Sequence, residues 1–330
     1  MIIGIDEARS LVQRAMEALE HDTSDAGLIA DHLMDCELRG LAYGGLPRAV
    51  SIVERLERSG NARTPVAVVH ETPVSARLDG GDNLGYVVGY RATRIAIEKA
   101  RKAGIAVVGA DRTWYTGMLS YYAEVAAAEG LVTMIASNAS PWVAPHGATE
   151  GRFGTNPICF GFPSTTDPII WDIGTSTIMH AEVLLAGREG RQLPENVAFG
   201  PDGQATRDPA QALAGAFAPW GGHKGSGLGI VVQLLGILAG SPVLPPDVAD
   251  FGFLIITLKP DLMMPEAEYR LKVTEYADAV RSARPVPGGA QVRMPFDRSV
   301  AERRRRLERG TIKVSDSVLE RLRDVAGRAA

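Results

Sequence analysis

The chain has 330 residues, of which 45% are hydrophobic and 22% are charged, and its formal net charge at pH 7 is −4. This balance is typical of a globular protein of two or three subdomains and excludes a coiled coil, a fibre or a wholly disordered chain. Because the charge creates no positive field that would attract a polyanion, we expect neither nucleic acid nor an anionic membrane as a partner.

The first 60 residues are expected to be helical. Apolar residues recur every three or four positions from Ile5 to about Glu20, and a second such stretch runs from Thr23 to the Arg39-Gly40 pair. A glycine and proline turn over residues 43–48 then precedes a third helix from Arg48 to about Ser59.

The middle of the chain has an α/β pattern. Residues 66–69 and 104–108 are short β-branched runs, and residues 92–102 between them have a helical composition, so the simplest reading is strand, helix, strand. Several of the later strand candidates are apolar throughout, as strands covered on both faces would be. They are residues 131–137, 158–162, 169–173 and 251–258.

Two further segments have an unusual composition. Residues 227–240 form the longest apolar run, but it falls short of the roughly 20 residues that cross a bilayer, so we expect a buried helix. Residues 299–309 carry four consecutive arginines, 303–306, among glutamates. Because both signs alternate, a solvated helix face paired with Glu302 and Glu308 is favoured over a phosphate patch.

The remaining composition gives no sign of export or of a metal site. Cys36 and Cys159 are the only cysteines, which excludes a disulfide framework and a four-cysteine zinc site. The six histidines have no metal-ligand spacing, so no metal is expected. The N-terminus lacks the basic and apolar regions of a signal peptide, and we expect a cytoplasmic protein.

Four polar or glycine-rich loops adjoin the strand candidates: residues 137–141, 154–157, 172–176 and 221–225. Loops at strand ends are where α/β proteins bind ligands, and their amides, hydroxyls and one lysine suit an anion. Ordinary turns would explain any one of these loops, but the four together favour a shared anionic ligand. Neither a Walker A motif nor a Rossmann glycine fingerprint is present.

The sequence resembles the malate/L-lactate dehydrogenase-like family of NAD(P)-dependent oxidoreductases over nearly its whole length. The resemblance rests on the motifs SNASP, GTNP and HKG and on three segments, residues 31–48, 117–164 and 221–240. It implies a homodimer with a non-Rossmann α/β fold of the sulfolactate dehydrogenase type. That fold has a mixed sheet with helices and a helical domain built from both chain ends.

The resemblance also implies domains and site residues. The expected domains are a helical one (1–70 with 295–330), a central α/β one (71–120 with 210–294) and a cofactor-binding α/β one (121–209). Arg48 would hold the carboxylate of a small-molecule substrate, which suits the planar fork of a guanidinium. The residues implied to contact NAD or NADP are Ser140, Asp172, Gly174, Thr175, Ser176 and Lys224.

The chain departs from the family pattern at three places. The family's Ser-His-Gly, whose histidine is taken as the acid/base, is replaced by Tyr43-Gly44-Gly45, and a second family histidine aligns with Tyr115. The later Pro-Gly-Glu becomes Pro295-Phe296-Asp297. Reduction of a ketone normally needs a positioned acid. Tyr43, Tyr115 or His180 could supply it, or the substrate could be a ketimine that arrives already protonated.

Three hypotheses follow. The leading one is an NAD(P)-dependent oxidoreductase that transfers a hydride to or from the 2-carbon of a small 2-oxo or 2-hydroxy carboxylate. The second is a cyclic ketimine or imino-acid reductase, which the loss of both histidines favours. The third is a homologue that binds nucleotide without catalysis.

Overall fold

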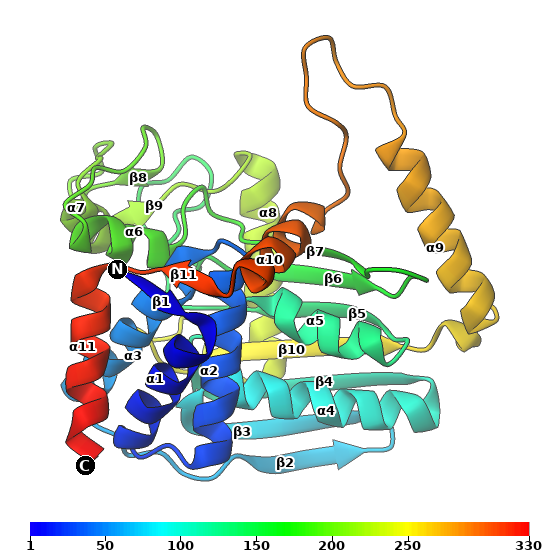
Figure 1. The fold of residues 1–330 in the computed structure, drawn as a ribbon, viewed down its shortest axis with the longest axis horizontal. Helices are drawn as coiled ribbons and strands as arrows, with labels where there is room; N and C mark the ends of the chain where they lie inside the picture. Colours follow the sequence, from blue (N-terminus) through cyan, green and yellow to red (C-terminus); the bar gives the residue numbers. More distant parts are fainter. Residues whose placement is uncertain (330) are drawn as a thin grey trace.

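The protein is built around one mixed β-sheet, which the computed structural model describes together with the rest of residues 1–329 (Figure 1). The strand order is β2-β3-β4-β10-β5-β6-β7. β3 and β4 pair in parallel, and the other neighbours are antiparallel. The strands are β2 (Ala67–Thr72), β3 (Ser75–Leu84), β4 (Ile105–Trp114), β5 (Val132–Ser137), β6 (Ile158–Phe162), β7 (Ile169–Ile173) and β10 (Phe251–Leu258).

Helices cover both faces of this sheet. Phe253 and Ile255 of the central strand β10 pack with residues of α4 (Gly85–Ala103) and α5 (Leu119–Ala128) in one core. On the opposite face Gly252 lies against the backbone of Gly236 in α8 (His223–Ala239). Strands covered on both sides need apolar residues throughout, and this confirms the expectation for the run 251–258.

One face of α8 is exposed, so the prediction that residues 227–240 are buried was wrong. Ile230, Val231, Leu234 and Leu238 are each 46–70% exposed. The glycines at 229 and 236 let the other side of the helix lie close to the sheet layer, against Phe153 and Asn138. Because the helix is apolar all round, its sequence could not reveal which side this chain covers.

The two ends of the chain meet in a helical lobe, as expected. α1 (Ile5–Ala18), α2 (Thr23–Leu38) and α3 (Leu46–Ser59) share one hydrophobic core with α11 (Asp316–Ala326). β1 (Ile2–Gly4) pairs with β11 (Thr311–Lys313), and both termini lie on this side of the molecule (Figure 1). Ala330, the last residue of the expected helical domain, lies outside the described residues. The domain boundaries stay a prediction.

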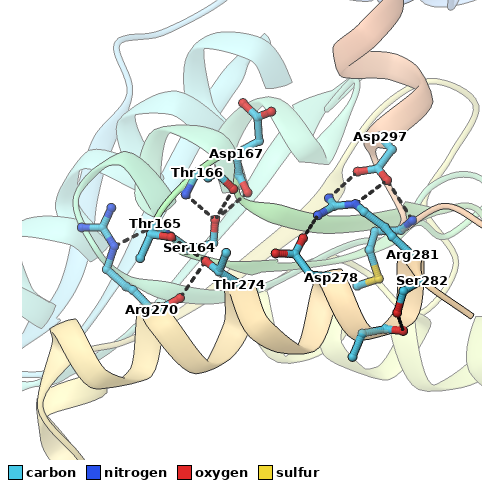
Figure 2. Close-up of polar contacts among 12 residues, drawn as sticks. Ser164, Thr165, Thr166, Asp167, Arg270, Thr274, Asp278, Arg281, Ser282 and Asp297 are labelled. Atoms are coloured by element: carbon cyan, nitrogen blue, oxygen red, sulfur yellow. Dashed lines mark hydrogen bonds and ion pairs between the residues drawn. The ribbon is translucent and has the colours of Figure 1, made fainter.

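Several shorter elements lie between or after the main helices and strands, and one long helix projects from the body (Figure 1). The shorter elements are η1 (Ala42–Gly44), α6 (His180–Arg188), β8 (Ala198–Phe199), α7 (Pro209–Ala214), β9 (Ala216–Phe217), η2 (Pro260–Leu262) and η3 (Gly327–Ala329). α9 (Glu266–Arg281) and the loop to α10 (Asp297–Arg309) extend away from the body (Figure 1). Figure 2 shows how α9 is attached: Arg270 donates to the Ser164 carbonyl at 2.9 Å, and Thr274 bonds Thr165.

The helices and strands named from the sequence are present, but others were not predicted, among them β3, α5, α6 and α9. The strand expected at 66–69 is the exposed edge strand β2, and it forms a hairpin with β3, which was not predicted. The β3 sequence, with charged residues and paired glycines, lacks the β-branched run that signals a strand. Arginines 303–306 of α10 pair with carboxylates of Asp35, Glu124, Asp167 and Glu302, which supports the ion-pair reading for Glu302, whereas the expected pair with Glu308 is absent among residues 1–329. No helix within residues 1–329 is long and apolar enough to span a membrane.

Glu37 is a buried carboxyl that makes stability depend on pH. It accepts a hydrogen bond from the Leu46 backbone at the start of α3 and is 3% exposed. Burial raises its pKa from 4.5 to about 7, although the nearby Arg306 charge opposes the rise. Because the folded state holds this proton more tightly than the unfolded chain, stability falls as pH rises from 4.5 to 7.

Glu37→Gln is therefore expected to stabilise the fold at the neutral end of that window by roughly 3 kcal/mol and to change it little near the acidic end. The glutamine can still accept the Leu46 hydrogen bond but carries no charge to bury. Urea unfolding at both ends of the window measures the difference, with exposed Glu308→Gln as the matched control. Equal stability of Glu37→Gln and the wild type at both pH values would contradict this account.

Candidate active site

A cavity of about 440 Å³ lies at the end of the sheet where β4, β5 and β7 stop and β6 and β10 begin. The helical lobe closes one side, the start of α6 another, and residues 295–299 a third. This position brings together segments that are far apart in sequence. The predicted site residues that line it are Tyr43, Arg48, Tyr115, Asp172, Gly174 and His180.

Arg48 carries the cation most directly available to a ligand. It lies in the first turn of α3, behind Pro47, and its guanidinium stacks on the ring of Tyr115 at 4.1 Å. Its Nη1 is buried and has no hydrogen-bond partner among the described residues. Leaving a buried charged donor unpaired is costly, so the arrangement favours an anionic group in the cavity.

Tyr115 holds that guanidinium in place. Its φ of 51° puts a bulky residue in the left-handed region, directly after Trp114 at the end of β4. Strain of this kind persists where the surrounding structure enforces it and is often found at functional sites. Because the ring face is occupied by Arg48, the tyrosine acts on the orientation of the guanidinium.

His180 is the histidine that lines the cavity. Its ring stacks on Trp142 with centroids 3.9 Å apart, and its buried Nδ1 has no partner within residues 1–329. Burial, with a smaller contribution from the positive charge of Arg48, lowers the pKa of His180 to about 3. The imidazole is therefore neutral near neutral pH. An anion bound to Arg48 would remove the second of these two causes.

Asp172 is the carboxylate in the cavity wall. It lies near the end of β7 and accepts a hydrogen bond of 2.7 Å from the Ser120 backbone in the first turn of α5. Burial raises its pKa to about 6, although hydrogen bonds from Ser120 and Leu119 lower the pKa and so limit the rise. The side chain thus ties the α5 N-terminus to the site and is partly protonated close to neutral pH.

The η1 turn brings Tyr43 and Gly44 to the cavity. A Cβ built on Gly44 would lie 3.3 Å from the Sγ of Cys36, so a side chain fits there after a small shift. This is the position where the family resemblance would place a histidine. Burial, followed by the nearby Glu182 charge, raises the pKa of Tyr43, so its phenol keeps its proton near neutral pH.

Four predicted cofactor contacts lie outside the lining of this cavity. Thr175 and Ser176 follow Gly174, and their hydroxyls donate to the carbonyls of Thr155 and Ile178. The Ser140 hydroxyl donates to the Pro246 carbonyl and accepts from the Val248 amide. Lys224 is exposed in the first turn of α8. Their contacts to a cofactor stay a prediction.

Sequence reasoning missed several residues of the cavity wall. Trp142 lies in a segment that was interpreted only as a family signature, and Tyr86 lies in a stretch for which no element was predicted. Phe296 and Arg298 also line the cavity, and the departure at Pro295-Phe296-Asp297 was the signal that could have identified them. Its significance depended on contacts between remote segments, which a single sequence does not give.

The lining fits a flat ring beside a small acid. Aromatic surfaces of Trp142, Phe251 and Tyr86 face the cavity together with the unpaired Nη1 of Arg48 and Nδ1 of His180. Aromatic walls with a few convergent polar atoms are typical of small-molecule sites of this volume. The residues therefore suit a nicotinamide ring and a carboxylate together. Among residues 1–329, no three His, Cys, Asp or Glu side chains gather as a metal site would require.

Comparison with known proteins assigns the chain to a family. The family model described as malate/L-lactate dehydrogenase matches residues 3–323. An L-sulfolactate dehydrogenase of Methanothermobacter thermautotrophicus is 31% identical, over 99% of this chain and 96% of that protein. A Δ1-pyrroline-2-carboxylate/Δ1-piperideine-2-carboxylate reductase of Pseudomonas syringae pv. tomato is 32% identical, over 93% and 92%. The solved sulfolactate dehydrogenase of Methanocaldococcus jannaschii superposes with a TM-score of 0.88 at 28% identity, covering 99% and 97% of the two chains.

Proposed function

The chain belongs to the malate/L-lactate dehydrogenase family of oxidoreductases, and we propose that it transfers a hydride between NAD or NADP and the carbon next to a carboxylate. The substrate is a small 2-oxo or 2-hydroxy acid. The observation that carries this proposal is the buried Nη1 of Arg48, which lies in an aromatic cavity and has no hydrogen-bond partner within residues 1–329. A carboxylate is the anion that a guanidinium fork holds with two parallel hydrogen bonds.

Each of the cavity residues has its own role in this hydride transfer. Arg48, oriented by Tyr115, holds the substrate carboxylate and so places the neighbouring carbon. The nicotinamide, when bound, supplies or accepts the hydride. His180 donates a hydrogen bond from its neutral ring to the oxygen on which negative charge develops, and that oxygen takes the proton that completes the hydroxyl group from solvent water. Trp142 keeps that ring in one plane.

A cyclic ketimine is the second candidate substrate, and Gly44 favours it. A glycine lines the cavity at the position where the resembling family has its acid/base histidine. Hydride transfer to a protonated imine yields a neutral amine, so that step needs no acid from the protein. The similarity to an imine reductase in Pseudomonas syringae pv. tomato is consistent with this alternative.

Consumption of reduced nicotinamide separates these candidates. Purified protein with NADH or NADPH is offered 2-oxo acids with and without methylamine, and cyclic imino acids. Turnover of plain 2-oxo acids is the expected result. Turnover that appears only with the amine or the cyclic imine would replace the leading substrate class by the second. Binding of cofactor without any turnover would instead support the non-catalytic hypothesis and contradict both.

We also propose that the protein forms a homodimer. We propose further that it resides in a reducing compartment such as the cytoplasm. The exposed apolar face of α8 continues into Val243 and Leu244, which are 70% and 49% exposed. Contiguous apolar patches of this kind mark interaction surfaces, and a second copy is the partner that the family implies. Cys36 and Cys159 are both free thiols and buried.

The double variant Leu234→Glu with Leu238→Glu is expected to weaken self-association about 100-fold or more, because it places two charges in an apolar contact. Light scattering on a sizing column measures the mass, and a dimer should become a monomer. Leu307→Glu, at an exposed apolar position on α10, is the matched control and should remain dimeric. A wild-type mass of one chain would contradict the dimer.

A further inference from the structure

One wall of the cavity is formed by residues 294–299, which lead into α10 and are named the 294–299 segment. Pro295, Phe296, Arg298 and Ser299 of this segment line the cavity. Phe296 has a φ of 79°, a left-handed backbone that a bulky residue rarely adopts. The position is therefore enforced by the contacts around it, and these contacts fix the direction in which the neighbouring side chains lie.

Two contacts anchor the segment to other helices, and a third, within the segment, fixes its shape. Arg281 of α9 donates from Nε and Nη2 to the Asp297 carboxylate at 3.0 and 2.7 Å (Figure 2). The same carboxylate accepts from the Met294 amide at 2.9 Å. On the other side, the Arg39 guanidinium lies 4.4 Å from the centre of the Phe296 ring. A two-bond arginine–carboxylate pair and a cation–π contact together hold the segment against the site.

Arg298 differs from the other arginines of its helix. Arg303, Arg304, Arg305 and Arg306 each pair with a carboxylate, whereas no hydrogen bond or ion pair joins Arg298 to another described residue. Its side chain is exposed and borders the cavity near Tyr43, whose phenol feels its charge. A cation thus borders the cavity without a partner among residues 1–329.

The charges that line the cavity are unbalanced. Arg48 and Arg298 are its cations, and Asp172 is its one carboxylate within residues 1–329. Asp172 is already occupied by backbone amides of α5. Two guanidinium groups, one deep and one at the mouth, therefore match a ligand with two anionic groups, because each guanidinium can take a carboxylate, sulfonate or phosphate in the same planar way.

We propose that Arg298 binds the second anionic group of a 2-oxo or 2-hydroxy acid whose first carboxylate is held by Arg48. Arg298 is then the specificity-determining residue for two-anion substrates, and Arg281 and Asp297 are positioning residues for it. The inference rests on the proposed function and names its substrate class. The phosphates of the cofactor are the other source of an anion at this place, and the experiment separates the two.

The test compares oxaloacetate, which has two carboxylates, with 2-oxobutyrate, which has one. Arg298→Met is expected to lower kcat/KM for oxaloacetate about 10- to 100-fold, as loss of a charge-assisted hydrogen bond does, and for 2-oxobutyrate less than about threefold. Arg298→Lys keeps the charge and should lose an intermediate amount. Arg305→Met, on the same helix and paired with Glu302 outside the cavity, should leave both values unchanged.

The other outcomes overturn the inference. An equal loss on both substrates, with a larger dissociation constant for NADH or NADPH, would assign Arg298 to a cofactor phosphate. No loss on either substrate would remove its role. If the wild type turns over no 2-oxo acid, the proposed function fails independently of this inference. Binding of oxaloacetate and 2-oxobutyrate, measured by quenching of Trp142 and Trp171 fluorescence, then tests the role of Arg298. Weaker binding of oxaloacetate alone in Arg298→Met supports the inference, and unchanged binding refutes it.

Discussion

Arg48→Met is expected to reduce kcat/KM about 10³-fold for a 2-oxo or 2-hydroxy acid, because the variant loses the two hydrogen bonds that hold the substrate carboxylate. The methionine fills a similar volume against Tyr115 without a charge. Cofactor binding should be preserved. The measurement is the initial rate of NADH or NADPH oxidation over a substrate series, together with a cofactor titration.

Two further variants sharpen this result. Arg48→Lys keeps the charge but not the planar fork, so it should recover only part of the loss. Arg58→Met removes an exposed arginine on the same helix, where its nearest carboxylate is 4.0 Å away, and should behave like the wild type. A loss of threefold or less in Arg48→Met would mean that the carboxylate is held elsewhere.

His180→Phe is expected to lower kcat for 2-oxo acids about 100-fold, since loss of one hydrogen-bond donor to a developing oxyanion costs about 10²- to 10³-fold. The phenyl ring can keep the stack on Trp142 while removing both nitrogens. With a cyclic ketimine the same variant should lose little. Because burial and Arg48 hold the pKa of His180 at about 3, the free enzyme should show no inflection from this group near neutral pH.

The tyrosines provide the contrasting result. Tyr115→Phe keeps the ring against Arg48 and removes the hydroxyl, so its kcat should change less than about threefold if His180 is the group involved. The same holds for Tyr43→Phe. A large loss in either variant, combined with a small loss in His180→Phe, would assign proton transfer to that tyrosine and contradict the role given to His180.

The local patterns predicted the fold better than the site. Periodicity identified the helices of the N-terminal lobe, and the run 251–258 identified the central strand, because both signals are short-range. β3 was missed because its pairing with β2 and β4 outweighs a weak strand propensity. The exposure of the α8 face could not be read from a helix that is apolar all round.

For the site, the sequence predicted which residues could carry the chemistry, but it did not predict which of them lie in contact. Arg48, Tyr115 and His180 were each named from sequence, and the fold brings them to one cavity. The contact between the Tyr115 ring and Arg48 depends on a left-handed backbone at Tyr115, and no sequence pattern predicts that conformation. Arg298 was missed for a similar reason, since its approach to the cavity depends on the Arg281–Asp297 contact.

The most direct test of the central claim, that Arg48 holds a carboxylate beside the reacting carbon, uses the wild-type protein. The 2-oxo acid with the highest rate is compared with its own amide, in which the carboxylate is replaced by a neutral group of the same shape. We predict a kcat/KM for the amide about 100-fold or more below that of the acid. Equal values for acid and amide would contradict the account.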